Sequence, residues 1–279
     1  MNMRSVTSSL CLLLLALLTL SGLVFVPPVL AKAGKIREFP LPHRNCCALA
    51  ITSGSDGHLW FTEFKANKIG RMTTRGSVRS FPVPTPNSRP NEITAGPDGN
   101  LWFTELFASQ IGRITPSGVI TECPLPNGGP LDDITSGPDG NLWFSELSAS
   151  QIGRITPSGV ITEFPLPSGS PSGDIASGPD GNLWFTEYTV NNIGRITPSG
   201  VVTEFPIPTH PTSIASGPDG NVWFAGDQED KIGRITPSGV VTEFPTPSGN
   251  TTHDVTPGPD GNVWFTEFSG NKIGRIKTS

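Results

Sequence analysis

Apolar and polar residues follow one another in a pattern that repeats roughly every 41 positions along the chain. The six Trp residues, at positions 60, 102, 143, 184, 223 and 264, are spaced by 42, 41, 41, 39 and 41 residues. Each Trp stands between Leu or Val on one side and Phe on the other. A fixed period of this length is typical of repeat architectures, in which each unit is one supersecondary element that packs on its neighbours.

One unit of the repeat contains four short segments rich in β-branched and aromatic residues, which favour β-strands. In the third unit these segments are residues 134–136, 142–144, 152–155 and 160–164. Pro138-Asp139-Gly140 joins the first two segments, and Thr156-Pro157-Ser158-Gly159 joins the last two. Proline presets φ and glycine accepts a positive φ, so both sequences predict tight hairpin turns. Four strands in about 41 residues is the size of a β-propeller blade.

The length of the chain fits six such blades. Without residues 1–33, about 246 residues remain, which is six units of about 41. We therefore predict an all-β fold, a six-bladed β-propeller of four-stranded blades, as a single domain over residues 34–279. Residues 35–40 match the fourth segment of the repeat, and residues 273–276 match the third. The N-terminal strand is therefore predicted to complete the C-terminal blade and close the ring, which would cover both open sheet edges.

The first 33 residues have the pattern of a secretory signal peptide. Arg4 supplies a positive charge, residues 10–26 are apolar, and Ala31-Lys32-Ala33 offers a cleavage site between small residues. The protein is therefore expected to be secreted, to the extracellular space or the periplasm, and to have no membrane contact after cleavage. An uncleaved membrane anchor is the alternative interpretation of the same segment.

Composition and charge narrow the classes of partner. The chain contains 32 Gly and 29 Pro, which the repeat explains as turn positions. Without Arg4 and Lys32, the remaining 17 basic and 24 acidic residues give a net charge of -7. This acidic balance argues against nucleic acid and anionic membrane surfaces as partners, and we expect a monomer. Cys46, Cys47 and Cys123 lack zinc-site spacing and are expected to be packing residues.

Candidate chemistry is predicted on one face of the ring. Antiparallel strands alternate in direction, so the variable loops before the first and after the second strand of each blade share a face. Three aligned rows of residues belong to that face. The first row is Leu49, Asn91, Asp132, Gly173, Thr212 and His253, and the second row is Ala50, Glu92, Asp133, Asp174, Ser213 and Asp254. The glutamate row, three residues after each Trp, is Glu63, Glu105, Glu146, Glu187, Gly226 and Glu267. The channel mouth is therefore predicted to be acidic, with His253 as its one histidine.

The glutamate row allows two interpretations. In one, each glutamate hydrogen-bonds to backbone groups of its own loop and is a structural part of the repeat. In the other, some of them converge on a divalent cation, and oxygen-only ligands would favour Mg²⁺ or Ca²⁺ over Zn²⁺. The arginine of each Gly-Arg pair is interpreted as a structural stacking or ion-pair partner, for example Arg154 with Glu163.

At these motifs the sequence resembles the streptogramin B lyases, also called virginiamycin B lyases. The resemblance rests on Ile-Thr-x-Gly-Pro-Asp-Gly-Asn-Leu-Trp-Phe-Thr-Glu, Asn-Lys-Ile-Gly-Arg-Ile-Thr and Gly-x-Ile-Thr-Glu-Phe-Pro-Leu-Pro, and it covers the whole mature chain. It implies a β-propeller that opens a cyclic depsipeptide antibiotic by elimination and depends on Mg²⁺. It therefore also implies a role in antibiotic resistance, and a small-molecule or cyclic-peptide ligand at the channel mouth.

The resemblance implies roles for two residues. Residues 252–256, Thr-His-Asp-Val-Thr, match a histidine stretch of the family, with Thr252 in place of Pro. Glu267 stands at the place of the family's metal-binding glutamate. Mg²⁺ held by Glu267 would polarise the ester carbonyl and acidify the adjacent C–H bond. His253 would remove that proton or protonate the leaving group, for which a histidine with a pKa near 6.5 is suited.

The sequence also departs from the family pattern. Thr212 stands where the family has a second rim histidine, and His210 lies two residues earlier. Thr251 replaces a glutamate and Leu49 an aromatic residue, and the known lyases have seven blades where this chain has six repeats.

Two other functions therefore stay open. One is a non-catalytic secreted propeller that binds a ligand or a protein through its acidic face, with His210, Asn91, Asp132 and Asp254 among the contacting residues. The other is a lactone hydrolase similar to the gluconolactonases, with a metal ion held by Asn91, Asp132 and one member of the glutamate row.

Overall fold

The computed structural model describes residues 38–41, 47–226, 230–268 and 270–278. The chain divides into two units, Met1–Phe39 and Pro40–Ser279, and the second holds the strands. The predicted signal peptide, residues 1–33, and half of the predicted N-terminal strand lie outside the described residues. Among the helices in the described part of the chain, none is long and apolar enough to cross a membrane.

Twenty-three strands and the short 3-10 helix η1 (Tyr188–Val190) make up the described secondary structure. The first three sheets contain β1 (Ala48–Ser53), β2 (Leu59–Glu63), β3 (Lys68–Met72) and β4 (Val78–Pro82); β5 (Pro90–Ala95), β6 (Leu101–Glu105), β7 (Gln110–Ile114) and β8 (Ile120–Pro124); and β9 (Leu131–Ser136), β10 (Leu142–Glu146), β11 (Gln151–Ile155) and β12 (Ile161–Pro165). The last three contain β13 (Ile175–Ser177), β14 (Leu183–Glu187), β15 (Asn192–Ile196) and β16 (Val202–Pro206); β17 (Pro211–Ser216), β18 (Val222–Gly226), β19 (Lys231–Ile235) and β20 (Val241–Pro245); and β21 (Thr252–Pro257), β22 (Val263–Glu267) and β23 (Lys272–Ile276).

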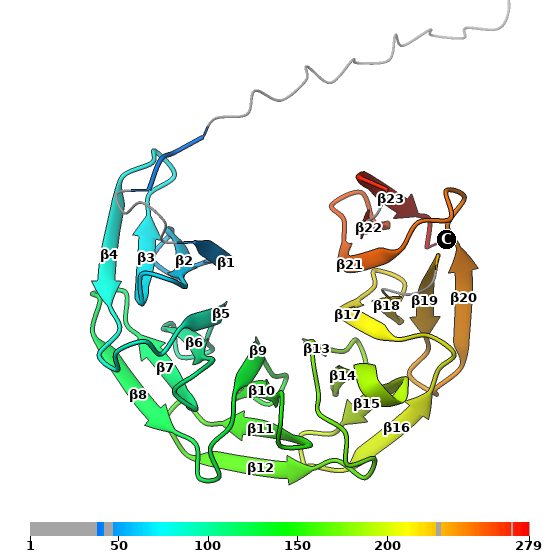
Figure 1. The fold of residues 1–279 in the computed structure, drawn as a ribbon, viewed down its shortest axis with the longest axis horizontal. Helices are drawn as coiled ribbons and strands as arrows, with labels where there is room; N and C mark the ends of the chain where they lie inside the picture. The colour runs from blue at the N-terminus through cyan, green and yellow to red at the C-terminus, as the bar shows by residue number, and fades with distance from the viewer. Residues whose placement is uncertain (1–37, 42–46, 227–229, 269, 279) are drawn as a thin grey trace, which may run out of the picture. The chain divides into compact units, whose positions relative to one another are not determined.

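The second unit is a β-propeller of six antiparallel sheets, which confirms the predicted fold class. Each sheet takes its strands in chain order, and consecutive sheets lie around a common centre with β1, β5, β9, β13, β17 and β21 innermost (Figure 1). Five sheets have four strands and the sixth has three. A fourth strand from residues 35–40 was expected there, but residues 35–37 lie outside the described part and residues 38–41 form no strand.

The predicted hairpin turns are present and are fixed by the residues that define the repeat. Gly140 and Gly159 adopt φ values of 75° and 89°, which an L-residue rarely reaches. The side chain of Asp139 accepts hydrogen bonds from Trp143 Nε1 (3.1 Å) and Asn141 Nδ2 (2.8 Å). Partial burial raises the pKa of Asp139, but these bonds outweigh it and hold the pKa below its ordinary value. The turn therefore holds the tryptophan in position.

The core lies between the sheets. Trp143 and Phe144 are both fully buried and lie on opposite faces of β10. Trp143 packs with Ile175 and Phe185 of the following sheet, whereas Phe144 packs with Trp102 of the preceding sheet. Five such clusters join consecutive sheets from the first to the last. The prediction that Trp and Phe form an interblade core is therefore confirmed.

The Gly-Arg pair of each third strand serves this core. A Cβ atom at Gly153 would lie 2.0 Å from Phe144 Cζ, so only glycine leaves room for the ring. Arg154 lies over the Trp143 ring, 5.6 Å from its centroid, and Nη1 donates a hydrogen bond to Pro198 O (2.9 Å) in the next sheet. The predicted stacking role is confirmed, but the nearby carboxylate is Asp139 (4.0 Å) and not the expected glutamate of the fourth strand. The tight turn that contains Asp139 brings its carboxylate closer to the Arg154 guanidinium than the glutamate of the fourth strand.

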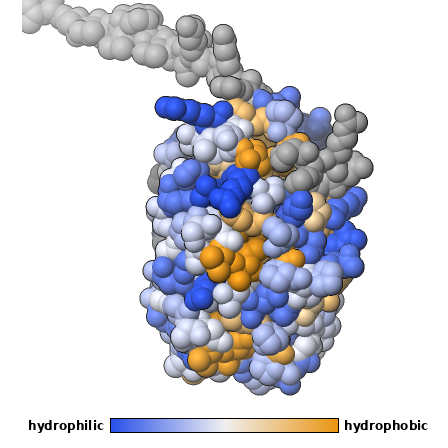
Figure 2. Space-filling model, turned by 90° about the vertical axis from the view of Figure 1, so that its left-hand side faces the viewer, coloured by the Kyte–Doolittle hydropathy of each residue, from blue (hydrophilic) through white to orange (hydrophobic). Residues whose placement is uncertain are grey.

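Figure 2 shows one side of the molecule, where hydrophobic residues form separate patches among hydrophilic ones. Cys47 and Cys123 are both free thiols. Cys123 Sγ would lie 3.3 Å from a Cβ at Gly159, at the place where Phe164 lies against Gly200 in the next sheet. Cys123 is therefore a packing residue, as predicted, whereas the same prediction is wrong for Cys47, which is exposed, and Cys46 lies outside the described residues.

In the part of the chain that the structure describes, the first and last sheets each leave one face without a neighbouring sheet. Ile273 of β23 is 65% exposed, whereas its counterpart Ile152 in the third sheet is fully buried. Ile51 of β1 is 61% exposed, whereas its counterpart Ile134 is 4% exposed. Figure 1 shows β1 and β21 standing well apart. Within the described residues, five of the six interfaces of a closed six-bladed ring are therefore formed.

A matched pair of truncations tests this arrangement. Ile152→Ala should lower the free energy of unfolding by about 2–4 kcal/mol, because it opens a cavity between two sheets. Ile273→Ala removes the same atoms at the same repeat position but from an exposed face, and should cost less than about 1 kcal/mol. Urea denaturation of both variants measures the difference. Equal losses would mean that the outer face of the last sheet is covered in solution.

Candidate functional site

A cavity of about 590 Å³ opens at the starts of the innermost strands. It is lined by Glu92, Asp132, Asp133, Leu147, Gly173, Asp174, Thr186, Tyr188, Pro211, Thr212, Ser213, His253 and Asp254. Nine of these thirteen residues belong to the first and second rows defined from the sequence. The predicted acidic mouth with one histidine is therefore present.

A β-bulge places these residues at the mouth. In β5, β9 and β21 the pairing with the next strand shifts register at the first-row and second-row positions, and in β17 it shifts at the first-row position. In β21, for example, Thr252 pairs with Glu267 and Val255 pairs with Phe265, so His253 and Asp254 form the bulge. A bulge bends the strand and redirects its side chains, which is why bulges often border functional sites. Three bulged first-row residues, Asp132, Thr212 and His253, line the cavity.

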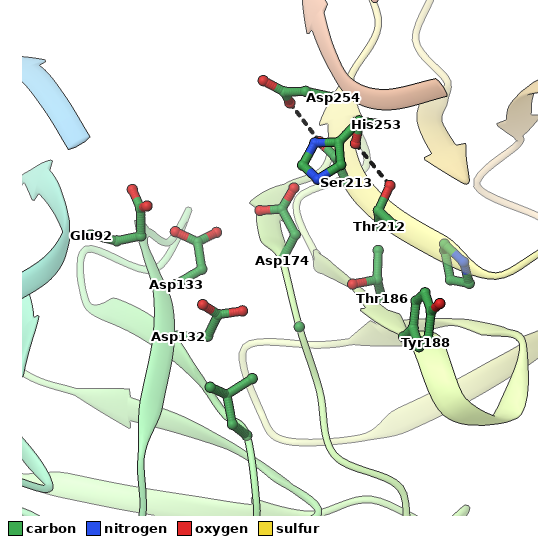
Figure 3. A pocket seen from close by; sticks show the side chains of 13 residues that line it. Glu92, Asp132, Asp133, Asp174, Thr186, Tyr188, Thr212, Ser213, His253 and Asp254 are labelled. Carbon is green, nitrogen blue, oxygen red and sulfur yellow. Dashed lines mark hydrogen bonds between the residues drawn. The ribbon is translucent and has the colours of Figure 1, made fainter. Parts of the chain in front are cut away.

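Carboxylates dominate one side of the cavity. Figure 3 shows Glu92, Asp132 and Asp133 across from His253, with Asp174 between them. Burial raises the pKa of Glu92 from 4.5 to about 7, and repulsion from Asp132, Asp174 and Asp254 adds to the shift. The pKa of Asp132 is raised for the same reasons, first burial and then Asp174. The cavity therefore favours a ligand that brings positive charge or hydrogen-bond donors.

Second-row aspartates also connect the sheets. Asp133 Oδ2 accepts a hydrogen bond from Ile175 N (3.0 Å), and Asp174 Oδ2 accepts one from Ile214 N (2.8 Å). The first bond joins β9 to β13, and the second joins the residue just before β13 to β17. Burial and the nearby Asp174 raise the pKa of Asp133 well above its ordinary value. These two carboxylates therefore have a structural role as well as a place at the cavity.

His253 lies at the cavity with its ring exposed. Thr212 Oγ1 donates a hydrogen bond to the backbone carbonyl of His253 (2.8 Å), which fixes the bulge against the preceding strand. The imidazole lies beside the ring of Phe268, with centroids 5.8 Å apart. Its position on β21, next to the lining residue Asp254, leaves it accessible to a bound molecule.

Glu267 is a neighbour of His253 in the sheet, but its side chain lies outside the cavity lining. The Cα atoms of Glu267 and Thr252 are paired across β22 and β21, one residue from His253. Its carboxylate accepts hydrogen bonds from Ser248 Oγ and Asn250 Nδ2, and these bonds lower its pKa. Both partners precede β21 in the same loop.

The other glutamates of the row are the last residues of β2, β6, β10 and β14, and all four are buried. Glu63, Glu105, Glu146 and Glu187 are fully buried, and each has one carboxylate oxygen with no hydrogen-bond partner among the described residues. Their other oxygens accept from Ser80, Gln110, Gln151 and Ser168. These four glutamates are therefore held by side-chain hydrogen bonds, and not by the backbone groups of the following loop that the structural interpretation predicted.

Two further candidates lie behind the cavity lining. Asn91 Nδ2 donates hydrogen bonds to Asp132 O (3.1 Å) and Oδ1 (3.4 Å), so Asn91 supports a lining residue. His210 packs against the ring of Tyr188, with centroids 5.3 Å apart, and Tyr188 lines the cavity. Asp132 and Asp254, the other two candidates, line the cavity directly.

The sequence rows missed the apolar part of the lining. Leu147 and Tyr188 each follow a member of the glutamate row directly, and the same position holds Phe64, Leu106 and Phe268 in other repeats. The signal for them in the sequence is an apolar residue directly after the glutamate, four positions after the Trp.

The chemistry of the donors near His253 suits Mg²⁺. Glu267, Ser248 and Asn250 offer oxygen atoms, and Mg²⁺ is commonly bound by one or two carboxylates with water completing the shell. The described residues hold no group of three or more His, Cys, Asp or Glu that could bind a metal ion. A bound Mg²⁺ would therefore depend on one carboxylate and on water or ligand oxygens.

Comparison with known proteins reveals a close family likeness. The family model described as Virginiamycin B lyase family matches residues 28–210 and 126–279. The crystal structure of selenomethionine-substituted virginiamycin B lyase from Staphylococcus aureus is 43% identical, with 88% of this chain and 85% of that chain covered and a TM-score of 0.81. A catalytically inactive histidine-to-alanine variant of the same enzyme, solved with quinupristin, is 41% identical, with 88% and 86% covered and a TM-score of 0.81.

More distant structures share the fold alone. A protein assigned provisionally as a gluconolactonase is 18% identical, with 86% of this chain and 93% of that chain covered and a TM-score of 0.55. At this identity the likeness supports the propeller architecture and not the lactone-hydrolase alternative.

The buried glutamates predict a pH dependence of stability. Burial raises the pKa of Glu146 from 4.5 to about 7, so the folded state holds this proton more tightly than the unfolded state. The free energy of unfolding should therefore fall as the pH rises from about 4.5 through 7. Glu146→Gln should remove part of this fall and should be more stable than the wild type at pH 8 by about 1 kcal/mol. Urea denaturation at pH 5 and pH 8 checks it.

Glu267→Gln is the matched control at the same repeat position. Because hydrogen bonds lower the pKa of Glu267, its carboxylate contributes stability above 4.5 that is lost as the pH falls. Its replacement should therefore destabilise the protein at pH 8. If Glu146→Gln also destabilises the protein at pH 8, the buried carboxyl group of Glu146 is held as an anion.

Proposed function

The chain belongs to the virginiamycin B lyase family, and from this premise we propose that it opens the ring of a streptogramin B-type cyclic depsipeptide by elimination. The observation that carries the proposal is the position of His253. It is the one histidine that lines the acidic cavity of the described residues. In the relative solved with quinupristin, the inactivating change replaces a histidine with alanine.

His253 is proposed as the acid–base group. In an ester elimination, a C–H bond next to a carbonyl breaks, and its electron pair forms a C=C bond to the neighbouring carbon. The bond between that neighbouring carbon and the ester oxygen breaks, which releases a carboxylate. The imidazole can accept the proton near neutral pH and return it to the leaving oxygen or to water. The Thr212 bond to the His253 carbonyl fixes the backbone beneath the imidazole. A fixed backbone lowers the entropy that the imidazole loses when it takes up the reactive geometry.

Glu267 is proposed as the ligand of a Mg²⁺ ion. Its lowered pKa keeps it ionised at neutral pH, as a metal ligand must be. When bound, Mg²⁺ would supply Lewis acidity that stabilises the negative charge developing on a carbonyl oxygen. The hydrogen bonds from Ser248 and Asn250 would orient the carboxylate.

One observation favours a non-catalytic binding protein as the second candidate. The hydroxyl of Thr212, at the position of the family's second rim histidine, bonds to the backbone carbonyls of His253 and Ala225. His210 packs on Tyr188 and does not line the cavity. A second proton-transfer group is therefore not supplied by either residue, although the cavity could still bind a cyclic peptide.

Export remains part of the proposal. The apolar N-terminal segment and its small-residue cleavage site support secretion, and a secreted lyase would act on an antibiotic outside the cytoplasm. The intact mass of the protein recovered from its natural compartment should correspond to a chain that begins at Gly34. A full-length mass with membrane association would instead support the anchor interpretation.

Ring opening can be measured directly with quinupristin as the substrate. With Mg²⁺, the wild type should convert it to a linear product of unchanged mass, because elimination adds no atoms. Hydrolysis would add the mass of one water, and solvent labelled with ¹⁸O would enter the product. His253→Ala should lower the rate by a factor of about 100 or more, and EDTA should abolish the reaction. Mass spectrometry after chromatography follows both products.

His58→Asn is the matched control for this experiment. His58 lies in a turn of the first sheet, where its ring bonds to Asp56, and other repeats have Asn at this position. The control should therefore keep the wild-type rate. Binding of quinupristin without ring opening would favour the non-catalytic candidate, and a full rate for His253→Ala would disprove the assigned role.

A further inference from the structure

The first sheet differs from the others in its charge. From the start of β1 to the end of β4, residues 48–82 contain five basic and two acidic residues, a balance of +3. The corresponding stretch of the third sheet, residues 131–165, contains one basic and five acidic residues, a balance of -4. The corresponding stretches of the other four sheets are also acidic. The net negative charge of the chain therefore coexists with one positively charged sheet.

The turn between β3 and β4 carries a marked departure from the repeat. Residues 73–77 read Thr-Thr-Arg-Gly-Ser, whereas the same turn in each of the next four sheets reads Thr-Pro-Ser-Gly-Val. Arg75 therefore stands at a serine position and Ser77 at a valine position, and Thr74 replaces a proline, which has no N–H. All three changes add hydrogen-bond donors, and one adds a positive charge. Because the turn forms without them in four other sheets, the fold does not require these donors.

These donors line a second cavity, of about 490 Å³, which we name the turn cavity. Its lining comes from the two turns of the first sheet: Gly57, His58, Thr73, Thr74, Arg75 and Ser77. Thr74, Arg75 and Ser77 are exposed. The turn after each innermost strand lies at the far end of that strand, whereas the acidic cavity lies at the strand starts. The two cavities share no lining residue and belong to opposite faces of the unit.

The hydrogen bonds of the turn leave side-chain donors for a ligand. Thr73 N–H donates to Ser77 O (2.9 Å), and Ser77 N–H donates to Thr73 Oγ1 (3.0 Å). In the third sheet the matching threonine hydroxyl also bonds to the hydroxyl of Ser158 (2.8 Å), but Arg75 stands at that position here. Within the described residues, the Arg75 guanidinium and the Ser77 hydroxyl have no hydrogen-bond partner. Both groups are therefore available to a bound molecule.

Neighbouring charges favour an anion at this end of the sheet. Arg71 and Arg79 are Cα partners in the β3–β4 ladder, and like charges directly opposite each other repel. In the third sheet the partner of Arg154 is instead Thr162. The carboxylate of Asp56, in the other turn, already lies 3.6 Å from Arg71 Nη1, which offsets its own charge. A cleft whose surroundings carry an excess of positive charge raises the local concentration of anions.

We propose that the turn cavity binds a phosphate group. The Arg75 guanidinium offers a fork of N–H donors that fits two phosphate oxygens, and the hydroxyl groups of Thr73, Thr74 and Ser77 offer donors for the others. A tetrahedral dianion can accept from more of these donors than a carboxylate, which has only two oxygens. The phosphate comes either free or as part of a phosphate ester. The inference goes beyond the proposed lyase reaction, because none of these residues lines the acidic cavity.

A titration of the intact protein with inorganic phosphate at pH 8 and constant ionic strength tests the site, because phosphate is then mainly the dianion. ¹H–¹⁵N spectra should show saturable shifts for residues 73–77. Arg75→Ser should weaken binding about tenfold or more, since it removes charge-assisted hydrogen bonds. Ser77→Val should weaken binding by a smaller factor. Both variants restore the residue of the next four sheets, so they should fold as the wild type does.

Lys65→Ser is the control matched for charge. Lys65 is exposed and lies in the loop after β2, at the other end of the same sheet, so this variant loses the same charge without altering the turn cavity. It should bind phosphate as the wild type does. An equal loss of affinity in Lys65→Ser and Arg75→Ser would show attraction by net charge only and would overturn the site.

Two further ligands define the class and the source of the anion. Tighter binding of glycerol 3-phosphate than of inorganic phosphate would identify a phosphate ester as the source, and equal or weaker binding would identify free phosphate. Either result supports the site. Acetate that binds as tightly as phosphate would overturn the assignment to phosphate. Shifts that do not saturate, or that saturate equally in Arg75→Ser, would overturn the proposal as a whole.

Discussion

The packing of a tryptophan between consecutive sheets is the interaction on which the rest of the molecule depends. In each of the five interfaces that are formed, one tryptophan ring bridges two sheets, so no sheet can bury its apolar faces alone. The turn aspartate, the stacked arginine and the glycine of the third strand all hold this ring or leave room for its phenylalanine neighbour. Because the same contacts recur along the chain, the innermost strands start at equivalent places, and their first residues meet around one cavity.

Most of the fold could be predicted from the sequence, because its period, turns and strand segments are local patterns. Trp143, Gly140 and Gly159 have the environments that their places in the repeat predict. The closure of the ring could not be decided in this way. A matching strand sequence at residues 35–40 shows what could pair with β23, but pairing also depends on how far apart the first and last sheets lie. That distance results from the packing angle of every interface, which no single motif encodes.

The candidate site was predicted in part, for a related physical reason. Aligned rows identified His253, Asp132 and Asp254 as lining residues, since repeat position fixes where a backbone lies. They did not show where each side chain points. Glu267 is one register step from His253, yet its carboxylate bonds to the preceding loop. Apolar lining residues such as Leu147 could not be predicted from the sequence, because an apolar side chain has no chemical group that distinguishes a cavity lining from a core position.

The bulges at the starts of the innermost strands have a consequence for how such a protein can change. A bulge residue is outside the regular ladder, so its side chain can be replaced without disturbing the contact between two sheets. The five first-row positions that lie in such bulges hold five different amino acids: Leu49, Asn91, Asp132, Thr212 and His253. Stability and chemistry are thereby assigned to separate positions of each repeat. Gene duplication can therefore copy the scaffold while point mutations diversify the rim.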